Sequence, residues 1–258
     1  MLDQCFISEA KRIVEEASRN GATLRVIGAT AIKMHCPKYA EAHERMDRKL
    51  TDLDFVALKS EKKEVLGVLQ KLGYMMDRNA QHIMTITQRY ILENPQNKLR
   101  LDVFFDKLEM CHTIDFRSRI SVDSPTISLA DLLLEKMQIV KINEKDIKDT
   151  LILLREHPVA EHDMESINSE YISKLLAKDW GFWYTVAQNL KKTKSFADRY
   201  ETLTSEDRAD IATKIAALLE GIEKAPKSMG WRMRARVGTK QRWYRDVEEV
   251  YQRETLSA

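Results

Sequence analysis

TLRVIGATAIKMH at residues 23–35 and LTDLDFVAL at residues 50–58 are the segments on which the architecture of this 258-residue chain depends. The first segment opens with an apolar run that ends at Gly28, and small residues with helix-like apolar spacing follow it. That order predicts a strand, a tight turn and the start of a helix. The second segment predicts a short strand that carries two aspartates, Asp52 and Asp54.

Asp52 and Asp54 are two residues apart, so their side chains point to the same face of the expected strand. The apolar residues beside them point to the opposite face, toward a core. Adjacent carboxylates repel each other unless a cation lies between them. Carboxylate oxygens are ligands that suit Mg²⁺ or Mn²⁺. The alternative is that the two aspartates stand at the end of a strand and are only solvated.

A third carboxylate lies in KLRLDVFFD at residues 98–106, where Asp102 stands inside an apolar run. A buried aspartate is costly without a partner. If its strand lies beside the strand of Asp52 and Asp54, the three carboxylates converge and can bind two metal ions for nucleotidyl transfer. The alternative is a salt bridge from Asp102 to a basic neighbour such as Arg100.

Three motifs thus follow one another along the chain, each in a predicted turn or strand: Gly28-Ala29-Thr30-Ala31-Ile32, Asp52-Leu53-Asp54-Phe55 and Leu101-Asp102-Val103. The set resembles the nucleotidyltransferase superfamily related to polymerase β. Within it, the set is most similar to the AbiEii-type branch, which includes toxins of bacterial toxin–antitoxin systems. The resemblance covers residues 20–155. It implies attack of an acceptor hydroxyl, on RNA for example, on the α-phosphate of a nucleoside triphosphate, with release of pyrophosphate.

The resemblance assigns catalysis and metal binding to Asp52, Asp54 and Asp102, with Mg²⁺ or Mn²⁺ as the cofactor. It assigns nucleotide binding to residues of the turn, of the charged stretch before Asp52 and of two later helices: Gly28, Ala29, Thr30, Arg48, Lys136, Lys145 and Asp149. Two departures are Ala29, which stands where the family has a second Gly or a Ser, and a longer stretch at 34–50. The methyl group of Ala29 limits the approach of a ligand. The departures favour an alternative, a catalytically silent nucleotidyltransferase fold that binds RNA or a protein partner.

The turn at Gly28 and the pair of Lys136 and Asp149 each have a physical reason to bind a phosphate, and each has an alternative explanation. The helix after Gly28 presents unpaired N–H groups and its positive dipole end to a phosphate, unless Gly28 only permits the tight turn. On a later helix, Lys136 can neutralise the charge of a triphosphate, while Asp149 can orient this lysine or another basic residue. The alternative is a simple ion pair between neighbouring surface helices.

The pattern of elements predicts an α+β fold in three regions: a nucleotidyltransferase-like domain with a small mixed sheet at 1–124, a helical domain at 125–225 and a basic segment at 226–258. In the first region we expect, in order, helix 5–20, loop 37–49, helix 60–73, a hairpin of strands 83–92 and 99–105, and edge strand 113–122. From residue 128 onward the apolar spacing predicts almost only helices, at 128–140, 145–157, 167–178, 180–191 and 204–222.

Cysteine content and the lack of long apolar runs indicate the cellular compartment that we expect for the protein. The three cysteines have no paired spacing, which indicates reduced thiols in a cytoplasm. His35, Cys36 and His43 fit no tetrahedral zinc spacing. No apolar run approaches the roughly 18 residues of a membrane span, and the first residues show no secretory signal. We therefore expect a cytoplasmic protein that does not bind a membrane.

The C-terminal region is basic. Residues 224–253 contain nine Lys or Arg and three acidic residues, a net charge of +6, whereas the whole chain carries +2. Arginines interleaved with Trp231, Trp243 and Tyr244 suit binding of the RNA backbone with stacking of bases. The alternative is a helix packed back onto the domain, with arginines that reach out to solvent. The aromatic residues at 180–184 are expected in the core.

Overall fold

The structure, a computed structural model, describes residues 2–76 and 89–246. Its centre is a five-stranded sheet in the order β1-β2-β5-β4-β3. The strands are β1 (Leu24–Ile27), β2 (Leu53–Ala57), β3 (Met75–Met76), β4 (Arg89–Glu93) and β5 (Arg100–Phe105). Only β2 and β5 are parallel, and the other three pairs are antiparallel. The sheet is therefore mixed, as the sequence predicts.

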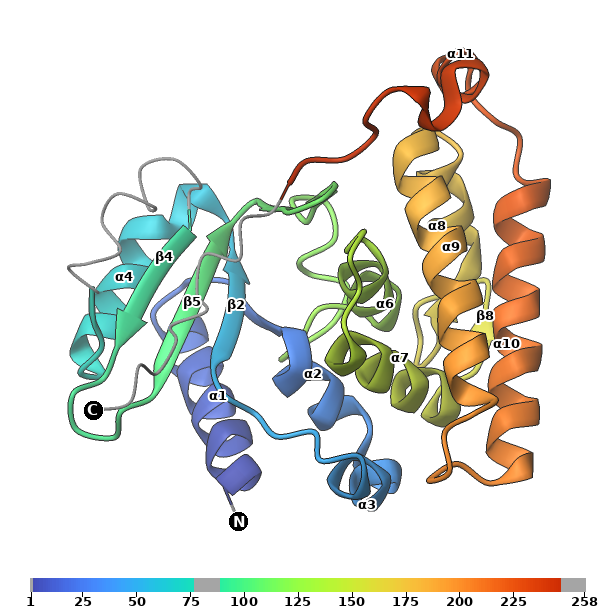
Figure 1. The fold of residues 1–258 in the computed structure, drawn as a ribbon. Coiled ribbons are helices and arrows are strands. Elements are labelled where there is room, and N and C mark those ends of the chain that lie inside the picture. The colour runs from blue at the N-terminus through green and yellow to red at the C-terminus, as the bar shows by residue number, and fades with distance from the viewer. Residues whose placement is uncertain (1, 77–88, 247–258) are drawn as a thin grey trace, which may run out of the picture.

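Apolar side chains of these strands explain the sheet. Leu53, Phe55, Leu101 and Val103 are fully buried, and alternate positions of β2 and β5 place them on one face. Helices α1 (Leu2–Arg19) and α4 (Lys62–Lys71) lie behind the strands in Figure 1 and cover that face. The residues between the buried positions, which include the aspartates, point to the opposite face.

The stretch between β1 and β2 differs from the expected loop. Helix α2 (Gly28–His35) begins directly at the glycine, and a short 3₁₀ turn, η1 (Pro37–Tyr39), and helix α3 (Ala40–Arg45) follow it. The loop prediction for 37–49 is wrong over most of its length. His43 and Arg48 of this stretch are buried, because they face a carboxylate of a later helix.

The predicted hairpin is confirmed where it is described: β4 and β5 pair antiparallel. Residues 83–88 of its first expected strand lie outside the described residues. The expected edge strand at 113–122 is wrong. Strand β7 (Thr113–Asp115) is short and pairs with β6 (Lys107–Glu109) in a separate two-stranded sheet.

The second half of the chain is mainly helical and lies beside the sheet (Figure 1). Its helices are α6 (Leu129–Met137), α7 (Glu144–Glu156), α8 (Ser169–Leu176), α9 (Trp180–Ala197), α10 (Ser205–Lys224) and α11 (Met229–Val237). The short strands β8 (Val159–Ala160) and β9 (Ile167–Asn168) stand between α7 and α8. Hydroxyl, amide and carboxylate side chains accept hydrogen bonds at the helix starts, as in the capping box of Thr204 and Asp207.

The two halves share one continuous hydrophobic core within the described residues. The proposed boundary at residue 124 falls beside β1, where the Val26 N–H donates to the Pro125 carbonyl at 2.9 Å. The division into domains stays a prediction. Within residues 2–76 and 89–246, no helix is long and apolar enough to cross a membrane.

Candidate functional site

Two of the three predicted carboxylates are direct neighbours in the sheet. In the parallel pairing of β2 with β5, Asp54 lies opposite Asp102. Asp52 stands one residue before β2, and its backbone carbonyl accepts a hydrogen bond from the Thr30 hydroxyl at 3.5 Å. The structure therefore brings Asp54 and Asp102 to one face of the sheet and sets Asp52 at the start of the same strand.

Asp54 is surrounded by like charge. Burial raises the pKa of this carboxyl well above its ordinary value of 3.8, and the nearby carboxylates of Asp52, Asp102 and Glu135 raise it further. The Arg89 guanidinium opposes these effects in part. Asp54 itself forms no ion pair among the described residues, although Arg89 acts on Asp102 and Lys136 on Glu135, and such a carboxyl favours a bound cation.

Asp102 forms a salt bridge to a basic residue, the alternative that the sequence left open, and the residue is Arg89. Arg89 lies on β4, and its guanidinium lies 5.2 Å from the centre of the Phe104 ring. Burial raises the pKa of Asp102, and Arg89, followed by Arg100, acts to lower it. One oxygen of the carboxylate, Oδ1, is buried and has no hydrogen-bond partner among the described residues.

Gly28 contacts two carboxylates, those of Asp54 and Glu135. It has a φ of +72°, which favours glycine, and a Cβ built on it would lie 2.8 Å from Asp54 Oδ2. Its N–H group donates to Glu135 Oε2 at 3.0 Å. The N-terminus of α2, where a phosphate was expected, is thus occupied by a carboxylate of the same chain. The two residues that follow are Ala29, partly buried, and Thr30, fully buried.

Glu135 was not found from the sequence. It is 9% exposed, in the apolar helix LADLLLEKM, and burial raises its pKa above the usual value while Lys136 acts to lower it. A charged residue in so apolar a helix is a usable signal, because burial of a carboxylate is costly. Arg89 was also missed, since its ion pair with Asp102 depends on the pairing of β4 with β5.

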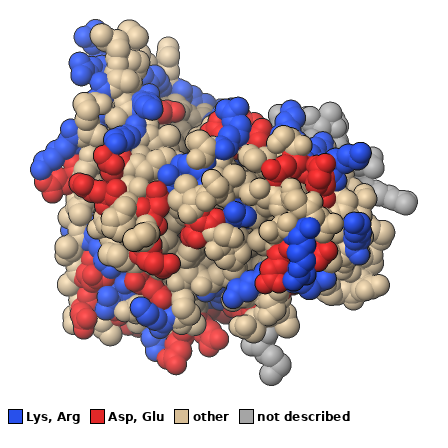
Figure 2. All heavy atoms as spheres, turned by 180° about the vertical axis from the view of Figure 1, so that it is seen from behind, with Lys and Arg blue, Asp and Glu red and all other residues tan. Residues whose placement is uncertain are grey.

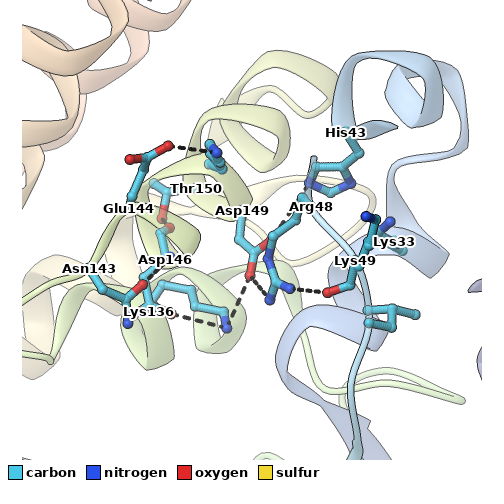
Figure 3. A network of polar contacts seen from close by, with 12 residues as sticks. Lys33, His43, Arg48, Lys49, Lys136, Asn143, Glu144, Asp146, Asp149 and Thr150 are labelled. Carbon is cyan, nitrogen blue, oxygen red and sulfur yellow. Dashed lines mark hydrogen bonds and ion pairs between the residues drawn. The ribbon is translucent and has the colours of Figure 1, made fainter. Parts of the chain in front are cut away.

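Three predicted nucleotide-binding residues meet in one buried network (Figure 3). Arg48 binds Asp149 through two hydrogen bonds, from Nε at 2.8 Å and from Nη2 at 2.9 Å. Lys136 Nζ lies 3.3 Å from Asp149 Oδ2 and 3.4 Å from Asp146 Oδ1. His43 Nε2 approaches Asp149 at 3.7 Å. Asp149 thus pairs with two basic residues, and these ion pairs lie in the interior, not on the surface.

The ion pairs of this network favour the charged forms of Asp149 and Lys136. Burial alone would raise the pKa of Asp149, but Lys136 and Arg48 lower it below the usual value. Burial acts to lower the pKa of Lys136, and Asp149 with Asp146 reverses this and raises it. Burial lowers the pKa of His43 to about 4, so this imidazole is neutral at pH 7. Lys136 is therefore a fixed positive charge beside Glu135.

Lys145 is the predicted residue that the structure sets apart. It is exposed in the first turn of α7, and it forms no ion pair within residues 2–76 and 89–246. Asp146 and Asp149, three residues apart on the same helix, face Lys136 instead. The neighbouring position 145 is turned by about 100° around the helix axis and points away.

A cavity of about 530 Å³ opens at Asp54 and Glu135. Its walls come from β2, the turn between β6 and β7, α6 and the segment after it, the start of α7, and the chain beyond α11. The lining residues are Asp54, Met110, Cys111, Glu135, Lys136, Ile139, Val140, Lys141, Asn143, Asp146, Tyr244, Arg245 and Asp246. This volume is within the range of pockets that bind small molecules. Its lining combines charged side chains, such as Asp54 and Glu135, with apolar and aromatic ones, such as Ile139 and Tyr244.

The donor chemistry of the site fits a divalent cation, although the side chains are not gathered around one point. Within the described ranges, no group of three His, Cys, Asp or Glu side chains is placed so that it could hold a metal ion. The unpaired oxygen of Asp102 and the repulsion around Asp54 are nevertheless what a cation would relieve. Asp52, Asp54 and Asp102 are the residues that would hold it.

Comparisons with known proteins give little guidance. No family model matches the chain, and no curated protein matches it. The chain is similar in structure to the antibiotic-resistance factor ANT(2'')-Ia in solution, with a TM-score of 0.40 and 14% sequence identity, over 68% of this chain and 95% of that one. So distant a likeness does not establish a shared activity, and the functional proposal depends on the geometry of the site.

Proposed function

We propose that this protein is a metal-dependent nucleotidyltransferase that moves a nucleoside monophosphate from a nucleoside triphosphate to an acceptor hydroxyl. One observation carries the proposal. Asp54 and Asp102 lie side by side on the two parallel strands, Gly28 at the start of α2 touches Asp54, and the pocket opens at Asp54. This arrangement combines carboxylates, a helix N-terminus and a cavity of the size that a nucleotide needs.

The residues of the chain have distinct roles in the proposal. Lys136, held by Asp146 and Asp149, supplies positive charge to the triphosphate at the wall of the pocket. The oxygen of the acceptor hydroxyl attacks the α-phosphorus, and Asp102 accepts the proton of that hydroxyl. Pyrophosphate leaves with the electrons of the broken P–O bond. A bound Mg²⁺ or Mn²⁺ would offset the charge of the carboxylates and of the phosphates.

RNA is the acceptor that we propose. Exposed basic side chains of α11 and of the chain after it support this choice: Arg232, Arg236, Lys240, Arg242 and Arg245. Figure 2 shows Lys and Arg at the protruding end of the molecule, which α11 forms in Figure 1. Exposed arginines of this density suit a phosphate backbone. Part of α11 also packs inward, since Arg234 lies 4.9 Å from the centre of the Trp180 ring.

A second candidate function is a silent nucleotidyltransferase fold that binds RNA or a protein. The observation that favours it is the hydrogen bond from Gly28 to Glu135, because a buried carboxylate takes the position of a phosphate. The paired aspartates argue against it. Asp54 and Asp102 repel each other, and a fold that never binds a cation has no evident use for such a pair.

Transfer of labelled nucleotide separates the two functions. The purified protein is incubated with each labelled nucleoside triphosphate, with Mg²⁺ or Mn²⁺, and with total RNA. Asp52→Ala and Asp54→Ala variants are compared with Asp198→Asn, which changes an exposed carboxylate at the end of α9. We expect label on RNA with the wild type and the control, and none with the site variants. Binding of nucleotide without transfer would support the silent fold. Equal transfer by all variants would overturn the site.

A further inference from the structure

The chain beyond α11 turns back to the pocket and is fixed there at two points. The segment Trp243–Arg245, which we call the strap, lies in the dark red trace that runs from α11 toward the sheet in Figure 1. At its first point, Trp243 Nε1 donates to the Thr185 hydroxyl at 3.1 Å. Close contact with α9 adds to this, because a Cβ on Gly181 would lie 2.6 Å from the Trp243 carbonyl oxygen. Helix α9 therefore holds the strap closely.

The second point of fixation is the turn between β6 and β7. The Arg245 N–H donates to the Cys111 carbonyl at 3.1 Å, and its Nη2 donates to the Thr113 hydroxyl at 2.7 Å. Tyr244 lies between the two fixed residues. Its ring meets the Trp243 ring at 69°, with 5.2 Å between centres, and the Arg242 guanidinium lies 4.9 Å from its centre. The position of Tyr244 is thus fixed by its two neighbours in the chain, Trp243 and Arg245.

Side chains of two chemical kinds line the pocket. The charged ones are Asp54, Glu135, Lys136, Lys141, Asp146, Arg245 and Asp246. Four other lining side chains are apolar or aromatic: Met110, Ile139, Val140 and Tyr244. A nucleoside triphosphate has the same division, with a charged chain of phosphates at one end and a flat base at the other. Aromatic rings bind bases by stacking, with little dependence on which base is present.

We infer that Tyr244 is the platform for the nucleobase, so that the C-terminal strap completes the nucleotide pocket. This inference rests on the proposed function and deepens it. It gives the strap a role other than contact with an RNA backbone, because Tyr244 faces the cavity that also contains Asp54. The phosphates then lie between Lys136 and the carboxylates, and the base lies against Tyr244 with the apolar wall around it.

Calorimetry of two ligands tests the inference in the full chain. Each nucleoside triphosphate and inorganic tripolyphosphate are titrated in the presence of Mg²⁺. Tyr244→Ala is expected to weaken binding of the nucleotides about tenfold, the scale of one stacked base, and to leave tripolyphosphate unchanged. Tyr244→Phe keeps the ring and should bind both ligands like the wild type. Gly181→Ala displaces the strap from α9 and should also weaken only the nucleotides.

The outcomes distinguish this inference from the proposed function. If Tyr244→Ala binds nucleotides as tightly as the wild type, or loses both ligands equally, the base does not stack on Tyr244. The proposed function then still stands when Asp52→Ala and Asp54→Ala abolish binding. If the wild type binds neither ligand with Mg²⁺, the proposed function fails and this inference fails with it. Thermal unfolding of each variant shows whether a loss reflects misfolding.

Discussion

Asp54 shows how one side chain combines an energetic cost with the role that we propose for it. It lies among Asp52, Asp102 and Glu135, and its pKa is well above the usual value because burial and these neighbours disfavour the charged form. A nucleotidyltransferase needs this carboxylate ionised when it binds a cation. The same crowding that would attract Mg²⁺ therefore destabilises the protein without the metal.

Replacing Asp54 with Asn should stabilise the metal-free protein at neutral pH. Because the folded-state pKa exceeds the unfolded value of 3.8, the folded state binds more protons between these two values, and stability falls as pH rises through that window. Thermal unfolding in a chelator should give Asp54→Asn a melting temperature higher by a few degrees at about pH 7.5, and a smaller difference near pH 4. A lower melting temperature at neutral pH would contradict this account.

Glu135→Gln should tighten nucleotide binding. The Glu135 carboxylate accepts the Gly28 N–H at 3.0 Å, so an incoming phosphate meets a negative charge at the N-terminus of α2. Gln keeps a hydrogen-bond acceptor and removes the charge, and we expect about fivefold tighter binding of nucleoside triphosphate, or about 1 kcal/mol. Glu144→Gln, at an exposed position of α7, is the matched control. Weaker binding by Glu135→Gln would mean that this carboxylate helps to bind the ligand.

At the scale of elements, local patterns explain what the sequence reveals. The apolar residues around Asp54 and Asp102 predict two strands, and the carboxylates were expected to meet if these strands lie side by side. The pairing of β2 with β5 places the strands so, with Asp54 opposite Asp102. Helix α3 was missed because its first turn has no side-chain cap and its residues are mostly polar. His43 and Arg48 are buried near it only because α7 brings Asp149 to them, a contact that no local pattern contains.

The buried network between α7 and the chain before β2 should contribute strongly to stability. Removing Asp149 leaves Arg48 and Lys136 as buried charges without their shared partner. We expect Asp149→Ala to lower the free energy of unfolding by about 3–5 kcal/mol. Urea unfolding at neutral pH measures the difference. Lys145→Ala, on the exposed side of the same helix, should change the value by no more than about 0.5 kcal/mol, and equal effects of the two variants would refute the network's role.

At the scale of the molecule, the basic C-terminal region and the pocket are connected by the path of the chain. Residues 224–253 carry +6 and the whole chain +2, so the remainder carries −4. The exposed face of α11 contains Arg232 and Arg236 beside the exposed Met229 and Met233, at helical spacing. The strap leads from this face to the pocket, where Tyr244 lines the wall. The strap would then guide an RNA that is bound on α11 toward the carboxylates.

The proposed binding of RNA on α11 predicts a particular dependence on salt. Each phosphate contact to a single strand contributes about −0.7 to the slope of log K against log salt concentration. Arg232→Ala combined with Arg236→Ala should therefore make the slope shallower by about 1.4, with weaker binding at low salt and little change in melting temperature. Lys11→Ala combined with Lys63→Ala removes two exposed charges on α1 and α4 as the control. If fluorescence anisotropy gives both double variants the wild-type slope, RNA does not bind this face of α11, whereas an equal loss in both would indicate attraction by net charge alone.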